Sequence, residues 1–86
     1  MIWQIDWDDR ARKELRSLDY PLQKKVLEYM RVRVSSNPRN FGKELIGNKS
    51  SLWRYCLADV RIICKIDDDV VRVLVVCVGH RKDVYV

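Results

Sequence analysis

The sequence has few of the residues that mark unusual classes of chain. Its 86 residues include only three glycines and two prolines, which excludes a collagen-like, low-complexity or disordered chain. The longest apolar run, residues 73–78, is far shorter than the roughly 20 residues of a membrane-spanning helix. Residues 2–5 are too few, and too interrupted, for a signal-peptide core. We therefore expect a cytoplasmic protein with no membrane partner.

Cysteine and histidine are also sparse. The three cysteines, Cys56, Cys64 and Cys77, are odd in number and widely spaced, and His80 is the single histidine. A disulfide framework or a structural zinc site needs more ligands at closer spacing. We expect reduced thiols that serve as small apolar side chains, and no metal or cofactor.

The chain does have enough apolar residues for one small core. It is 48% hydrophobic and 34% charged, and its length leaves no room for a second core. We expect a single domain spanning residues 1–86.

Positive charge is concentrated in the middle of the chain. The net charge is +5, yet residues 31–65 alone hold eight basic and two acidic side chains. Such an excess attracts phosphate polyanions or an acidic protein segment. A solvated basic face that keeps the protein soluble is the remaining alternative.

The order of elements is predicted from periodicity and turn residues. Residues 2–5 indicate a short strand, and Asp8 can cap a helix with one apolar face. Pro21 suits the first position of a second helix, which ends near residues 35–38. Residues 39–51 form a basic loop, and three strands follow at 52–57, 60–66 and 70–78. The predicted fold is α+β, with a helical hairpin packed on one face of a mostly antiparallel four-stranded sheet (β-α-α-β-β-β).

The second and third strands predict where the cations lie. With Ala58 and Asp59 as the turn, Leu57 pairs with Val60 and Cys56 with Arg61. Side chains alternate across a sheet, so one face is apolar and meets the helices. The opposite face, on which cations converge from two adjacent strands, shows Arg54, Cys56, Arg61, Ile63 and Lys65.

Two motifs near the C-terminus resemble a known family. The segment LWRYCLADVRIICKI (residues 52–66), followed by VGHRKDVY (residues 78–85), resembles the RelE-type toxins of bacterial type II toxin–antitoxin systems. The likeness extends over essentially the whole chain. It implies a metal-independent endoribonuclease that cuts mRNA in the ribosomal A site and inhibits translation. In such an enzyme the RNA 2′-hydroxyl attacks the adjacent phosphate, and an arginine stabilises the charge that develops there.

The resemblance assigns roles residue by residue. Arg61 and Arg81 would hold the scissile phosphate, and Arg54 would position RNA or assist. Tyr85 would stack on or orient the nucleotide. Contacts to RNA phosphates would come from Lys43, Lys49, Lys65 and Lys82.

Departures from the family pattern keep other functions open. Cys56 stands where a second basic residue is usual, and Ala58 stands where the turn usually has glycine. His80 is a weaker candidate for catalysis, because it should point away from Arg81. The alternatives are a ParE-like inhibitor of DNA gyrase, or an attenuated toxin that acts mainly as an antitoxin-binding co-regulator. The implied partners are an acidic antitoxin, the ribosome with mRNA, and operator DNA bound through the antitoxin complex.

Overall fold

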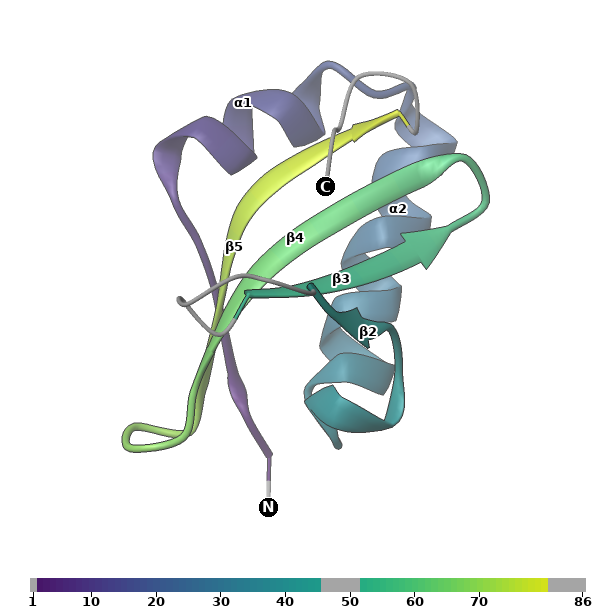
Figure 1. The fold of residues 1–86 in the computed structure, drawn as a ribbon. Coiled ribbons are helices and arrows are strands. Elements are labelled where there is room, and N and C mark those ends of the chain that lie inside the picture. The colour runs from purple at the N-terminus through teal and green to yellow at the C-terminus, as the bar shows by residue number, and fades with distance from the viewer. Residues whose placement is uncertain (1, 46–51, 81–86) are drawn as a thin grey trace.

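Two helices cover one face of a five-stranded sheet in the computed structural model, which describes residues 2–45 and 52–80 (Figure 1). The strand order is β1-β5-β4-β3-β2, with β1 parallel to β5 and the other pairs antiparallel. The elements, in chain order, are β1 (Gln4–Trp7), α1 (Asp9–Arg16), α2 (Tyr20–Glu28), a π-helical turn η1 (Tyr29–Val34), a 3-10 turn η2 (Pro38–Asn40), β2 (Lys43–Glu44), β3 (Leu52–Leu57), β4 (Val60–Asp67) and β5 (Arg72–His80).

Local sequence explains where the helices begin. Asp8 caps α1, because its Oδ1 atom accepts the N–H of Ala11 at 2.8 Å. Pro21 lies in the first turn of α2, where its missing N–H costs no hydrogen bond. The Asp8 cap confirms the prediction, whereas Pro21 is the second residue of the helix and not the first, because α2 begins at Tyr20. The helix continues beyond α2 through η1 to Val34, close to its predicted end, but the wider π-helical geometry of η1 was not predicted.

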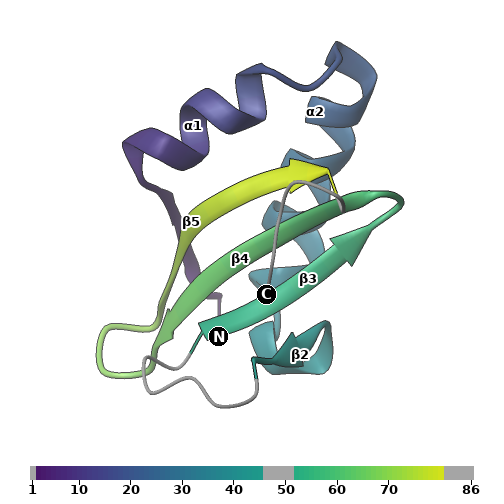
Figure 2. The same ribbon diagram turned by 45° about the horizontal axis from the view of Figure 1, so that its top comes forward.

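The helices bury a shared core against the sheet. Val26, Met30 and Val34 project from α2 and η1 into the same buried cluster as Tyr55 and Val75 of the strands. Figure 2 shows α1 alongside β5, while α2 runs behind the sheet. The two consecutive helices thus lie on one face as predicted, but α1 packs mainly on β5 rather than along α2.

The predicted hairpin and its register are confirmed. Leu57 pairs with Val60 and Cys56 with Arg61, across a turn at Ala58 and Asp59. The apolar side of this hairpin faces the helices: Trp53, Tyr55, Leu57, Val60, Ile62, Cys64 and Ile66.

The predicted strand count and several strand boundaries were wrong. The segment expected to be a loop contains a fifth strand, β2, which pairs Lys43 with Arg54. The first strand runs from Gln4 to Trp7, and the N–H of Trp3, just before it, donates to the Ser35 carbonyl at the end of the helices. The last strand begins at Arg72, after a turn that includes Val71 at φ 53°, and it runs on to His80.

A β-bulge changes the alternation within β5. Cys64 pairs with Val75 and Ile63 with Cys77, which leaves Val76 as an extra residue. Val75 and Val78 are consequently both buried against the helices, although they are three residues apart. The extra residue Val76 also determines which backbone N–H groups the rest of β5 presents at the edge that faces away from β4.

Candidate nucleic-acid interface

Four cations come from three adjacent strands onto the sheet face that the helices leave uncovered. Lys43 of β2 lies directly opposite Arg54 of β3, and Arg54 lies opposite Ile63 of β4. Arg61 and Lys65 are two residues to either side of Ile63, on the same face. Both are therefore diagonal neighbours of Arg54, at a spacing of about 7–8 Å in antiparallel sheets. Long side chains reach across such a spacing, so Arg54 and Arg61 can contact one phosphate group together.

These four side chains differ in exposure. Lys43 and Lys65 are exposed, whereas Arg54 and Arg61 are half-buried, and the Nε atom of Arg54 is itself buried. Within residues 2–45 and 52–80, no carboxylate forms an ion pair with Lys43, Arg61 or Lys65. Their charge remains available to an anionic ligand.

Two uncharged residues complete the centre of this face. Cys56 is exposed and lies directly opposite Arg61, as the sequence predicted. Ile63 was expected to be part of an open face, but its side chain is only 4% exposed. Arg54 is its direct neighbour across the strands, so this face is closed to water at Ile63 and open at Cys56 and Lys65.

Gly42 places β2, and with it Lys43, beside β3. Its φ of 67° favours glycine, and a Cβ atom there would lie 2.2 Å from the Arg54 carbonyl oxygen. Trp53 Nε1 donates to the Phe41 carbonyl at 2.6 Å, and the Leu45 N–H donates to the Leu52 carbonyl at 3.1 Å. Because only glycine permits this close approach, Lys43 lies beside the cations of β3 and β4. The four side chains together form the cation row: Lys43, Arg54, Arg61 and Lys65.

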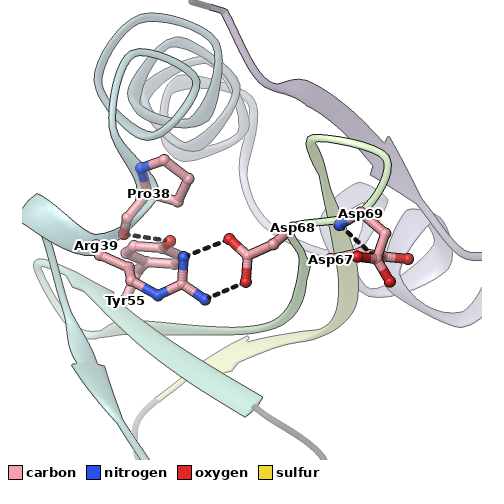
Figure 3. A network of polar contacts seen from close by, with 6 residues as sticks. All are labelled: Pro38, Arg39, Tyr55, Asp67, Asp68 and Asp69. Carbon is pink, nitrogen blue, oxygen red and sulfur yellow. Dashed lines mark hydrogen bonds and ion pairs between the residues drawn. The ribbon is translucent and has the colours of Figure 1, made fainter.

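A bidentate ion pair ties the segment before β2 to the turn between β4 and β5. Arg39 donates to both carboxylate oxygens of Asp68, at 2.8 and 2.9 Å (Figure 3). This bond lowers the pKa of Asp68 and raises that of Arg39. The Arg39 guanidinium also lies over the Trp53 ring, 6.0 Å from its centroid. Arg39 is thus engaged within the chain and does not belong to the cation row.

Tyr55 of β3 also holds the segment before β2 in place. Its hydroxyl donates to the Pro38 carbonyl at 2.7 Å, and its side chain is fully buried (Figure 3). Burial raises the pKa of Tyr55 well above its ordinary range, so the hydroxyl stays protonated. The Tyr29 ring packs edge-on against the Tyr55 ring at 6.1 Å.

Two carboxylates of the uncovered face, those of Asp6 and Asp67, lie near Arg72 of β5. Arg72 lies 3.9 Å from both Asp6 and Asp67, measured between the charged atoms. Leu74 separates Asp6 from Lys65 across the strands. The face is therefore divided into a cationic part on β2, β3 and β4 and a charge-balanced part around Arg72.

His80 lies on the opposite side of the sheet from Arg61. It pairs with Val60, whose side chain faces the helices, whereas Arg61 pairs with Gly79. An imidazole on that side does not face a phosphate held by Arg61. Four other predicted site residues, Lys49, Arg81, Lys82 and Tyr85, lie outside the described residues.

Neither a metal cluster nor a membrane span is found in the part of the chain that the structure describes. There, no three His, Cys, Asp or Glu side chains are placed to share a metal ion. No helix within residues 2–45 and 52–80 has the length and apolar character needed to cross a bilayer.

Sequence reasoning missed Gly42, Arg39 and Glu14. The only signal at Gly42 was a glycine within a basic loop. Arg39 and Asp68 are 29 residues apart, and no local pattern connects them. Glu14, on the polar side of α1, accepts the backbone N–H of Val78 at 3.0 Å, a contact that only the tertiary fold creates.

One family of proteins matches almost the whole chain. The sequence model described as "ParE toxin of type II toxin-antitoxin system, parDE" matches residues 5–85. A search of curated proteins finds no relative that matches.

Solved structures with the same fold include several toxins. The toxin–antitoxin complex RelBE2 from Mycobacterium tuberculosis matches with a TM-score of 0.88 at 23% identity, covering 94% of this chain and 100% of the other. The intact Escherichia coli RelBE complex matches with a TM-score of 0.78 at 28% identity, covering 91% and 95%. A double arginine-to-alanine mutant of free Escherichia coli RelE matches with a TM-score of 0.81 at 27% identity, covering 96% and 87%.

Proposed function

Because this chain belongs to the ParE toxin family of type II toxin–antitoxin systems, and is a RelE-type toxin of the RelE/ParE superfamily, we propose that it is an mRNA endoribonuclease. It cuts mRNA on the ribosome, needs no metal ion, and thereby inhibits translation. A cognate antitoxin neutralises it.

One observation carries this proposal. Lys43, Arg54, Arg61 and Lys65 lie on the same sheet face, and none of the helices within residues 2–45 and 52–80 covers that face. A row of cations on adjacent strands follows the repeating phosphates of a nucleic-acid backbone. A face whose cations were all neutralised internally would not support RNA binding. Among the described residues, Lys43, Arg61 and Lys65 form no ion pair with a carboxylate.

The chemistry needs placement and charge more than proton transfer. For the 2′-hydroxyl to attack in line, the two flanking phosphates must be held rigidly, which the cation row supports. The planar Arg61 guanidinium can donate two hydrogen bonds to a phosphorane. Arg54, its diagonal neighbour, can hold the same or the adjoining phosphate. Arg81 and Tyr85, proposed from the resemblance, would complete the site from the end of the chain.

Removal of Arg61 tests the proposal. Purified toxin is mixed with ribosomes that carry a defined mRNA, and 5′-hydroxyl cleavage products are measured over time. We expect Arg61→Ala to lower the rate by about 10²–10³, the usual loss for one transition-state donor. Arg12→Ala removes an exposed arginine from α1 and should cleave normally. Equal rates for the wild type and Arg61→Ala would contradict the proposed role.

Inhibition of DNA gyrase is the second candidate function. The description of the matching family, a ParE toxin, favours it. The two functions separate cleanly, since gyrase inhibition stops DNA supercoiling in a purified assay and leaves mRNA on ribosomes intact. An attenuated toxin that acts only as a co-regulator would do neither.

The proposed antitoxin is acidic and covers the cationic face. The Mycobacterium tuberculosis and Escherichia coli structures described above are toxin–antitoxin complexes, which supports such a partner. A groove of about 690 Å³ between β1 and α2 offers apolar side chains for further contact, among them Ile2, Trp3 and Leu27. Through this antitoxin the complex would bind operator DNA. Leu27→Asp should weaken antitoxin binding without lowering mRNA cleavage.

A further inference from the structure

The outer edge of β5 lacks a neighbouring strand over its last residues. β1 pairs with β5 only as far as Trp7 and Val75, and the N–H of Asp8 makes the last backbone bond, to the Val75 carbonyl at 3.0 Å. The chain then turns into α1. In the described part of the sheet, no further strand borders β5 on this side. An uncovered edge of this kind leaves backbone N–H groups without partners and weakens the strand.

Glu14 of α1 occupies the place of the missing strand. Its Oε1 atom accepts the N–H of Val78 at 3.0 Å, and its side chain is only 29% exposed. Ala11 and Leu15, on either side along the helix, are buried in the core and fix the position of α1. A hydrogen bond to a carboxylate is stronger than one between neutral groups. The bond therefore fastens the end of β5 to a helix whose neighbouring residues are held in the core.

The fastened residues are those that border Arg61. Val78 pairs with Ile62, Gly79 with Arg61, and His80 with Val60. In the sequence, Arg81 follows directly. We propose that Glu14 is a positioning residue for RNA cleavage: its carboxylate holds residues 78–80 in place beside Arg61, and so keeps the arginines of the site in register. This inference rests on the proposed function and adds a residue to it that touches neither RNA nor the reacting atoms.

A merely structural role would be carried by different contacts. Glu14 also forms an ion pair with Arg10 at 3.5 Å, but Arg10 is 73% exposed and the pair lies on the helix surface. Exposed pairs of this kind contribute little. Arg10→Ala is therefore a matched control, because it removes a contact of the same carboxylate and leaves the bond to Val78 intact.

The test compares four variants by ribosome-dependent cleavage and by amide hydrogen exchange. Glu14→Ala should lower kcat by about 10- to 100-fold, as expected when a reacting geometry loosens, and should leave KM within about threefold. The amides of residues 78–80 should exchange faster in this variant. Glu14→Gln retains an acceptor oxygen and should stay close to the wild type in both readouts. Arg10→Ala should match the wild type. Gln23→Ala, which removes hydrogen bonds from α2 to the end of α1 and the residues after it, reports the effect of reduced stability alone.

Each other outcome overturns the inference. If Glu14→Ala cleaves as fast as Gln23→Ala, or if cleavage falls while exchange at residues 78–80 is unchanged, Glu14 does not position the strand. A raised KM with unchanged kcat would instead mean that Glu14 contacts the ribosome. Wild-type protein that cleaves no mRNA would refute the proposed function itself, and the inference with it, whatever the variants show.

Discussion

Cys56 and Arg61 are direct neighbours across the β3–β4 hairpin, and both lie on the sheet face that carries the proposed RNA site. A thiol cannot stabilise a phosphate as a guanidinium does. The centre of the cation row therefore has one position that is exposed and chemically unused.

An arginine at this position should strengthen the enzyme. Cys56→Arg places a second guanidinium beside Arg61, so we expect mRNA cleavage on programmed ribosomes to rise by about 10- to 100-fold, in line with the contribution of a transition-state donor. Cys56→Ser, which has a similar size and no charge, should leave the rate unchanged. Unchanged cleavage by the arginine variant would show that this position does not limit the reaction.

Gly42 should tolerate no side chain. In Gly42→Ala the new Cβ atom would meet the Arg54 carbonyl oxygen at 2.2 Å, and the backbone would keep a φ of 67°. We expect the free energy of unfolding in urea to fall by about 1–3 kcal/mol. Asn40→Ala, at an exposed position of η2, is the control. Full stability of Gly42→Ala would mean that β2 moves away from β3 at little cost.

Ala58 is strained, and glycine should relieve the strain. Its φ is 54°, in the left-handed region that favours the glycine usual at this turn position. Ala58→Gly should raise the free energy of unfolding by about 1 kcal/mol, which corresponds to about 4–8 °C in the melting temperature. Asp59→Gly, at the neighbouring turn residue without a positive φ, should give no such gain. A lower melting temperature for Ala58→Gly would refute the strain.

The hydroxyl of Tyr55 should matter more than that of an exposed tyrosine. Tyr55→Phe leaves the Pro38 carbonyl without its donor at 2.7 Å in a buried site, at a cost of about 1–3 kcal/mol in unfolding free energy. Tyr20 is 69% exposed, so Tyr20→Phe should have almost no effect. Equal stabilities for the two variants in urea unfolding would show that water replaces the lost bond.

The Arg39–Asp68 pair should make stability depend on pH in the acid range. The pKa of Asp68 in the folded protein lies below its ordinary value of 3.8. Its contribution is therefore complete above that value and disappears as the pH falls through the lowered pKa. Asp68→Asn should be less stable than the wild type at pH 6, and the difference should vanish in strong acid. By NMR titration, Arg39→Ala should return the Asp68 pKa towards 3.8; an unchanged pKa would show that Arg39 does not cause the shift.

The sequence predicted the cationic face because that face depends on local rules. The turn at Ala58 and Asp59 fixes the register of two strands, and alternation then places Arg54 and Arg61 on one side. The capping of α1 by Asp8 is likewise encoded within a few residues. These features need no knowledge of the rest of the chain.

Other features depend on contacts between distant segments. β2 has only two residues, too few for a periodic pattern, and it forms because Gly42 allows the chain to approach β3. The burial of Ile63 and the bond from Val78 to Glu14 follow from tertiary packing. The left-handed conformation of Val71 is unusual for a β-branched residue, so residue preferences in turns do not predict it.

The bulge at Val76 gives β5 two different neighbours along one edge. Up to Val75 the strand is hydrogen-bonded to the parallel strand β1. Three residues later the N–H of Val78 is bound by the Glu14 carboxylate of α1. In a regular strand without the bulge, the backbone N–H of Cys77, rather than that of Val78, would point towards that carboxylate. Such a strand would also turn Gly79 towards the helices and His80 towards Arg61. One extra residue thus determines which side of the sheet the last residues of β5 face, and it places Gly79 rather than Val78 directly opposite Arg61.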